Sequence, residues 1–167
     1  FLYPLLAARD GALDQGLFIA LLTPVVMTLL GSAFLVFGAL QRRRRHIFVL
    51  GTCYLLAAVG FTIQSFDLGL GLTVKKFAAN AIFVAAMLLL SGAAICRQNI
   101  AVPYVSFGVM GVATLSIFSW FLFVDVDFMM RVFAINFGLG AMCFVTGILL
   151  TRSRRQALID RVVTWMA

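Results

Sequence analysis

Residues 17–40 read LFIALLTPVVMTLLGSAFLVFGAL, and no charged side chain occurs among them. An α-helix needs about 20 apolar residues to cross the hydrocarbon core of a bilayer, which is about 30 Å thick. A basic run, Gln-Arg-Arg-Arg-Arg-His, follows at once as residues 41–46. Because an uncharged stretch of this length next to a basic run is typical of a membrane-spanning helix, the sequence predicts an integral membrane protein.

The rest of the chain repeats this alternation of apolar stretches and short polar breaks. Of its 167 residues, 63% are hydrophobic and 11% are charged, whereas a soluble domain carries about 25% charged residues. We expect an all-α membrane protein in which an extracytoplasmic segment, residues 1–16, precedes a transmembrane helical bundle, residues 17–167. Its five complete spans and the truncated start of a sixth are expected at residues 17–40, 47–66, 77–95, 103–124, 128–151 and 157–167.

Basic residues are unevenly divided between the two ends of these predicted spans. One end carries nine of them, namely Arg42, Arg43, Arg44, Arg45, Arg97, Arg152, Arg154, Arg155 and Arg161. The other end carries four, namely Arg9, Lys75, Lys76 and Arg131. Cytoplasmic loops carry the excess of Lys and Arg, so we expect a multi-pass protein of the bacterial inner (plasma) membrane with its N-terminus outside. The net charge of +7 then belongs to loops at the bilayer and does not indicate a nucleic-acid partner.

Three amide side chains interrupt the predicted spans at a similar depth, in the outer half of the bundle. They are Gln64, Asn80 and Asn136. Hydrocarbon offers a polar group no partner except another protein group or trapped water, so such residues mark candidate sites. Two interpretations stay open: the amides bond one helix to another, at about 0.6–2 kcal/mol each, or they line a pocket for a small ligand or lipid.

Charged residues at the outer ends of the spans would form the rim of this candidate pocket. Asp127 and Arg131 are four residues apart, a spacing that also stabilises a helix start by roughly a few tenths of a kcal/mol. This spacing therefore favours a purely structural role for the pair, and a place in the rim is the alternative interpretation. The candidate ligand-binding residues are Gln64, Asp67, Asn80, Asp125, Asp127, Arg131 and Asn136.

Pairs of small residues predict where the helices pack closely. Ala81 and Ala85 are four residues apart, as are Ala134 and Gly138. This spacing removes bulk from one helix face and lets two backbones approach. We expect these positions to make contacts within the bundle.

The residues that most cofactors require are missing. His46 is the sole histidine and the chain has no glutamate, which excludes haem ligation by two histidines and histidine-based metal clusters. No lysine falls within a predicted span, which excludes a retinal Schiff base. We therefore expect no enzymatic activity, no catalytic residue, no metal and no cofactor in this chain.

Several stretches resemble the N-terminal integral-membrane sensory region of bacterial diguanylate cyclases, whose C-terminal GGDEF domain makes cyclic di-GMP. The resemblance covers about residues 42–166 and is carried by RRH ending at His46, LG at Leu50, GFTIQ at residues 60–64, KFAANAIF at residues 76–83, FSW at residues 118–120, VDVDFMMRVFAIN at residues 124–136, and LIDR at residues 158–161 with Trp165. Val126 stands where such proteins typically have proline between two aspartates.

The resemblance implies a signal-input role in a larger protein. This chain contains no GGDEF motif, so a cytoplasmic effector domain and at least one further span would follow it. A homodimer formed through the full-length protein would also be expected. The alternative hypothesis is half of a small-molecule transporter, or its accessory subunit.

Overall fold

The computed structural model contains five α-helices and no strands among the residues that it describes, which are 3–40, 45–66, 69, 71–98 and 101–166. Side chains are described within residues 21–40, 46–66, 69, 71–98 and 101–152. The helices are α1 (Tyr3–Leu40), α2 (Arg45–Ser65), α3 (Leu72–Cys96), α4 (Tyr104–Phe123) and α5 (Phe128–Met166). All five are long and apolar enough to cross a membrane. The prediction of an all-α chain with five apolar helices long enough to cross a membrane is confirmed.

Three helix boundaries differ from the predicted spans. Helix α3 begins at Leu72 and not at residue 77, so Lys75 and Lys76 belong to its first turns. Helix α1 includes most of residues 1–16, the segment expected outside the membrane. Helix α5 continues through residues 152–157 to Met166, and no separate sixth helix is present in the described part of the chain.

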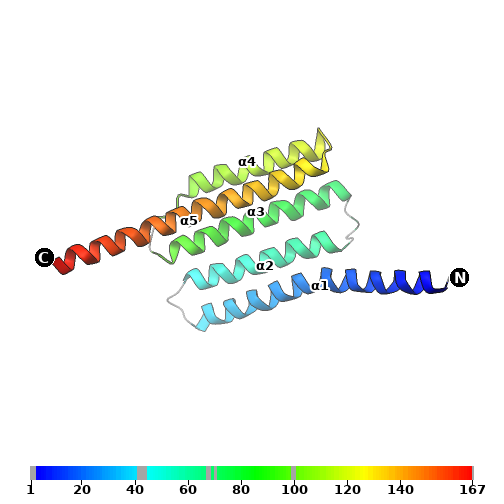
Figure 1. The fold of residues 1–167 in the computed structure, drawn as a ribbon, viewed down its shortest axis with the longest axis horizontal. Helices are drawn as coiled ribbons and strands as arrows, with labels where there is room; N and C mark the ends of the chain where they lie inside the picture. Colours follow the sequence, from blue (N-terminus) through cyan, green and yellow to red (C-terminus); the bar gives the residue numbers. More distant parts are fainter. Residues whose placement is uncertain (1–2, 41–44, 67–68, 70, 99–100, 167) are drawn as a thin grey trace.

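The physical reason is the same in each case, because charge marks the edge of the hydrocarbon and does not end a helix. Arginine and lysine have good helix propensity, and residues 152–157 contain neither Pro nor Gly. Helices α1 and α5 contain 38 and 39 residues, which corresponds to about 57 and 58 Å at 1.5 Å per residue. Both are longer than a bilayer core, and they project from opposite ends of the molecule (Figure 1).

The helices form an open row and not a closed ring. Helix α1 packs against α2 alone, α2 packs against α3, and α3 also contacts both α4 and α5, which pair with each other. Consecutive helices run in opposite directions (Figure 1). A hydrophobic core cluster of buried residues consists of Val84, Ile95, Phe107 and Met142. The core therefore lies among α3, α4 and α5, and α1 and α2 extend the row from it.

Glycines permit close packing of α1 against α2 and of α4 against α5. A Cβ atom added to Gly51 of α2 would lie 2.9 Å from the backbone nitrogen of Leu35 in α1, and one added to Gly31 would lie 2.8 Å from the Leu55 side chain. A Cβ on Gly138 of α5 would overlap the side chain of Thr114 in α4. The prediction of a close contact at Gly138 is confirmed, whereas the α1 and α2 contact lies at positions that the spacing argument did not identify.

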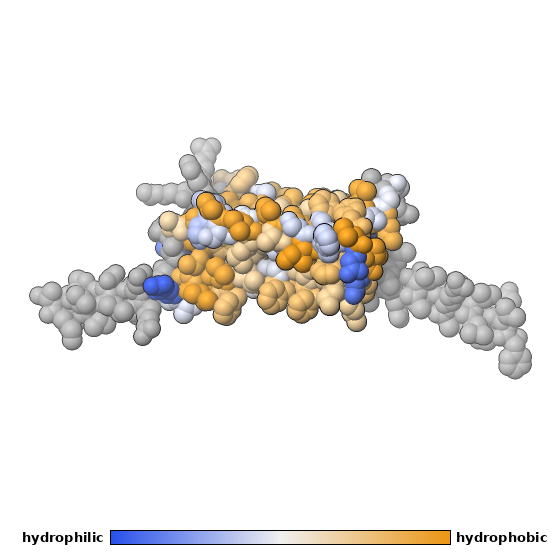
Figure 2. All heavy atoms as spheres, turned by 90° about the horizontal axis from the view of Figure 1, so that it is seen from above, coloured by the Kyte–Doolittle hydropathy of each residue, from blue (hydrophilic) through white to orange (hydrophobic). Residues whose placement is uncertain are grey.

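The surface has the polarity expected of a protein that crosses a membrane. Figure 2 shows apolar surface along the middle of the described part, with hydrophilic residues gathered near its two ends. Large side chains such as Leu29, Val105 and Phe137 are more than 60% exposed. Water would penalise such a surface at about 25 cal/mol per Å², so lipid is its natural solvent.

Candidate ligand-binding site

A polar pocket lies at the end of the bundle where α2 and α4 finish and α3 and α5 begin. Its volume is about 260 Å³. We refer to it below as the polar pocket, and it is lined by Gln64, Lys76, Asn80, Phe118, Phe128, Arg131, Val132, Ile135 and Asn136. Four helices, α2 to α5, contribute to its wall.

The structure brings together four of the seven candidate residues. Gln64 comes from the last turn of α2, Asn80 from the early part of α3, and Arg131 and Asn136 from the first turns of α5. They share one end because antiparallel crossings return the chain to the same side after every second span. Asn80 and Arg131 are half-buried, and Gln64 and Asn136 are exposed.

The three acidic candidates are not among the residues described as lining the pocket. Asp67 lies outside the described residues. The Asp127 carboxylate accepts hydrogen bonds at Oδ1 from the backbone N–H groups of Met129 and Met130, at 2.8 and 3.2 Å. Asp127 therefore caps α5 in the usual N-terminal manner. Asp125 is exposed in the connection between α4 and α5.

The asparagines do not join one helix to another in the described structure. Asn80 Nδ2 donates to the carbonyl of Lys76 at 2.8 Å, and Asn136 Nδ2 donates to the carbonyl of Val132 at 2.9 Å. Both bonds are to the preceding turn of the same helix. Each amide has a carbonyl oxygen and a second N–H besides this bond, and a pocket ligand can use them.

Lys76 lines the pocket, although it is not among the predicted site residues. The signal was its spacing, because Lys76 and Asn80 are four residues apart and therefore share a helix face. The second cation, Arg131, has its guanidinium carbon 5.8 Å from the centre of the Phe128 ring. This cation–π contact helps hold the guanidinium at the pocket wall.

An apolar cavity of about 330 Å³ lies nearer the middle of the helices. It is lined by Met27, Cys53, Tyr54, Ala57, Phe61, Phe83, Ala86, Met87, Leu90 and Leu139. The Cys53 thiol donates to the Ala86 carbonyl, with the sulfur 3.0 Å from the oxygen. Its hydrogen-bonding capacity is therefore used between α2 and α3, and carbon dominates the remaining wall.

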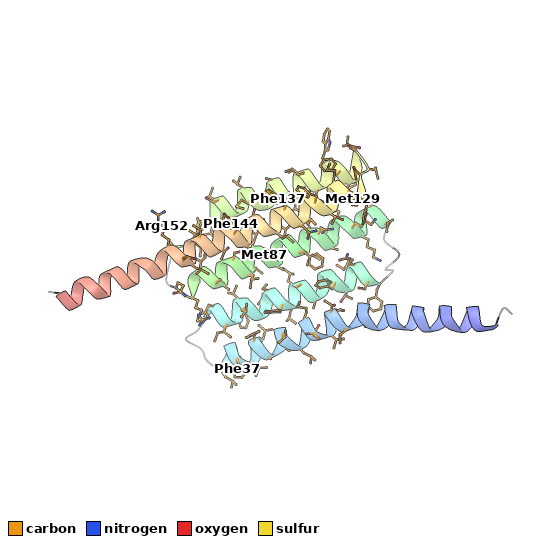
Figure 3. The ribbon with its side chains drawn as sticks, in the orientation of Figure 1. Phe37, Met87, Met129, Phe137, Phe144 and Arg152 are labelled. Carbon is orange, nitrogen blue, oxygen red and sulfur yellow. The ribbon has the colours of Figure 1, made fainter. Side chains whose placement is uncertain are left out.

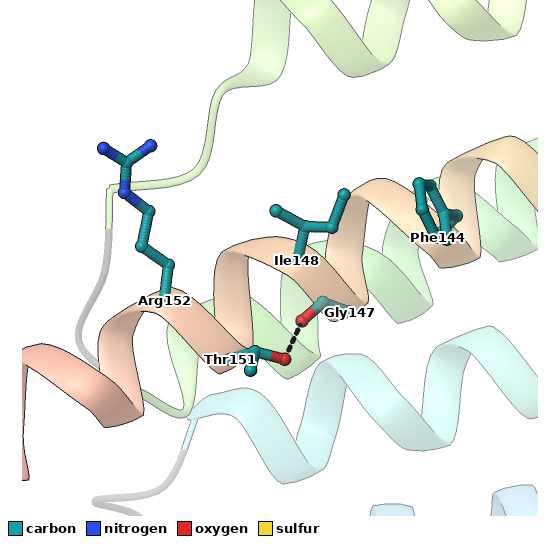
Figure 4. A pocket seen from close by; sticks show the side chains of 5 residues that line it. All are labelled: Phe144, Gly147, Ile148, Thr151 and Arg152. Carbon is teal, nitrogen blue, oxygen red and sulfur yellow. Dashed lines mark hydrogen bonds between the residues drawn. The ribbon is translucent and has the colours of Figure 1, made fainter.

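A third hollow lies on α5 near Arg152 (Figure 4). The described residues that line it all belong to this one helix, namely Phe144, Gly147, Ile148, Thr151 and Arg152. The Thr151 hydroxyl donates to the Gly147 carbonyl at 2.7 Å, within the helix.

No protein-family model, curated protein or solved structure matches this chain. The resemblance to the sensory region of diguanylate cyclases therefore rests on the sequence motifs alone. The geometry of the polar pocket is the independent observation on which a functional proposal can be built.

Proposed function

We propose that this chain is a membrane-embedded signal-input domain that regulates an attached cytoplasmic effector, of the diguanylate cyclase type that the sequence motifs resemble. One observation carries the proposal. The polar pocket takes five of its nine described lining residues from α5, and the same helix runs to the opposite end of the bundle and beyond it. Figure 3 follows α5 from Met129 at one end to Arg152 at the other.

A continuous helix is a suitable element for carrying a signal across a bilayer. Its backbone hydrogen bonds make it stiff, so a shift or rotation at Arg131 moves the far end as well. A ligand produces such a shift only if it binds two arrangements of α5 with different affinity. In the proposed orientation the pocket faces the outside of the cell and the far end of α5 enters the cytoplasm.

Replacing the pocket amides in the full-length protein tests this function. Gln64→Leu, Asn80→Leu and Asn136→Leu together remove the polar groups and keep similar volumes. We expect a several-fold change in effector output with an unchanged amount of folded protein in the membrane. Thr62→Val with Ser116→Ala is a matched control, because both residues lie in the same helices as pocket residues but do not line it. If the triple variant and the control variant gave the same effector output, the proposal would be rejected.

The alternative, half or an accessory subunit of a small-molecule transporter, would use the same pocket as a substrate site. The two functions differ in the sequence that accompanies this chain in its reading frame. A GGDEF or kinase domain on the cytoplasmic side supports signal input. A second set of five spans supports transport, because many transporters are built from paired repeats.

A further inference from the structure

The polar pocket and the apolar cavity occupy successive turns of the same three helices. On α2, Gln64 of the pocket and Phe61 of the cavity are three residues apart, and Asn80 and Phe83 are three apart on α3. On α5 the cavity residue Leu139 comes one turn after Ile135 of the pocket. Residues three or four apart share a helix face, so the two spaces follow one another along the groove between these helices.

The chemistry of the polar pocket selects an anion. Lys76 and Arg131 supply two positive charges, and Gln64, Asn80 and Asn136 supply amide N–H groups. None of the described residues that line the pocket is acidic. A phosphate or carboxylate group complements this lining, and charge-assisted bonds of this kind are about twice as strong as neutral ones.

The chemistry of the apolar cavity selects a hydrocarbon chain. The rings of Phe61 and Phe83 stand where the cavity begins, with centroids 4.8 Å apart. The lining then continues along α3 through Met87 to Leu90. The distance along the helix from Asn80 to Leu90 is about 15 Å, or about three turns.

We infer that this groove binds an anionic amphiphile, with its negatively charged head group in the polar pocket and its hydrocarbon chain in the apolar cavity. The inference deepens the proposed function and rests on it for its physiological meaning, because it names the ligand class of the sensory pocket. The head group lies beside α5 at Arg131 and the chain contacts α5 at Leu139, so occupancy engages the proposed output helix at two levels.

Selective lipid retention tests the role of the cations. The full chain is placed in phosphatidylcholine nanodiscs that contain a minor fraction of phosphatidylglycerol, and bound lipid is counted by native mass spectrometry. We expect preferential retention of phosphatidylglycerol. Lys76→Gln and Arg131→Gln should each reduce this preference about tenfold, the effect of one lost charge-assisted contact.

Lys75→Gln is the matched control for general attraction between lysine and anionic lipid. It removes the same charge one residue away, and Lys75 does not line the pocket. The control should keep the preference for phosphatidylglycerol. Equal retention of both lipids by the unaltered chain, or an equal loss in Lys75→Gln and Lys76→Gln, would overturn the inference.

Chain length tests the role of the apolar cavity. Ala57 lines the cavity and is half-buried, so Ala57→Phe should fill it and reduce the preference for long-chain over short-chain phosphatidylglycerol. This preference is a ratio measured on one sample, so partial loss of folded protein does not imitate the effect. Displacement of the lipid by inorganic phosphate alone, at concentrations comparable to the lipid, would show that the chain contributes nothing and would overturn the amphiphile assignment.

These experiments test the ligand assignment and the sensory function independently of each other. Selective retention of phosphatidylglycerol without any change in effector output in the Leu triple variant would reject the sensory function and keep the ligand assignment. Altered effector output without selective retention of phosphatidylglycerol would reject the ligand assignment and keep the sensory function.

Discussion

Gly138 shows how one hydrogen atom in place of a side chain allows two helices to meet. A Cβ at this position would overlap Thr114 of α4. We therefore expect Gly138→Ala to destabilise the chain by about 1–3 kcal/mol, the usual cost of overpacking, as measured by thermal unfolding in detergent. Gly140→Ala is the matched control, because a Cβ there meets nothing within 4 Å. Equal melting temperatures of the two variants would contradict this contact.

Asp127 acts through its carboxylate oxygen as the N-cap of α5. Asp127→Ala should cost about 1 kcal/mol of stability, because two backbone N–H groups lose their acceptor. Asp127→Asn keeps an acceptor oxygen and should be close to neutral. Asp125→Ala, at an exposed position, controls for the loss of negative charge. Denaturant titration of the three variants measures these differences, and an equal loss in Asp125→Ala and Asp127→Ala would favour an electrostatic effect over capping.

Helix α5 both lines the polar pocket and carries the proposed signal to the other end of the bundle. It is continuous from Phe128 to Met166, so backbone carbon chemical shifts should stay helical through residues 152–157. Ser153→Pro should end that helical signal near Leu149, because proline removes one hydrogen bond and clashes with the preceding turn at about 3 kcal/mol. Ser153→Ala should leave the shifts unchanged. Coil-like shifts at residues 152–157 in the unaltered chain would contradict a continuous helix.

The two ends of the molecule carry unequal charge. Because a membrane-impermeant reagent reaches only one side of a bilayer, labelling tests which end faces outward. We expect a cysteine at position 125 to react with a membrane-impermeant maleimide in intact cells, and a cysteine at position 98 to react only in inverted vesicles. Both natural residues, Asp125 and Gln98, are exposed, and the three native cysteines would first be replaced by alanine. Reversed labelling would overturn the outward N-terminus, and labelling of both on one side would contradict an odd number of crossings between them.

The five apolar helices and the gathering of the three amides at one end of the bundle followed from local sequence. Lipid is the favourable solvent for an uncharged stretch such as residues 17–40, and a helix of this length matches the thickness of the bilayer core. Gln64, Asn80 and Asn136 fell at one end because alternate crossings reverse direction. The start of α3 at Leu72 and the continuation of α5 beyond Arg152 could not be predicted from local sequence. A basic residue marks the edge of the lipid, but the backbone there remains helical.

Sequence alone therefore determined that the chain forms five apolar helices long enough to cross a membrane, with its amides near one end, since hydropathy and length are properties of each segment. Only the tertiary structure decided that Lys76 joins the pocket, that Asp127 turns away to cap α5, and that the helices form an open row. These outcomes depend on which face each helix presents to its neighbours. Side-chain packing between helices sets the rotation of each helix about its axis. The sequence of one segment alone does not determine this rotation.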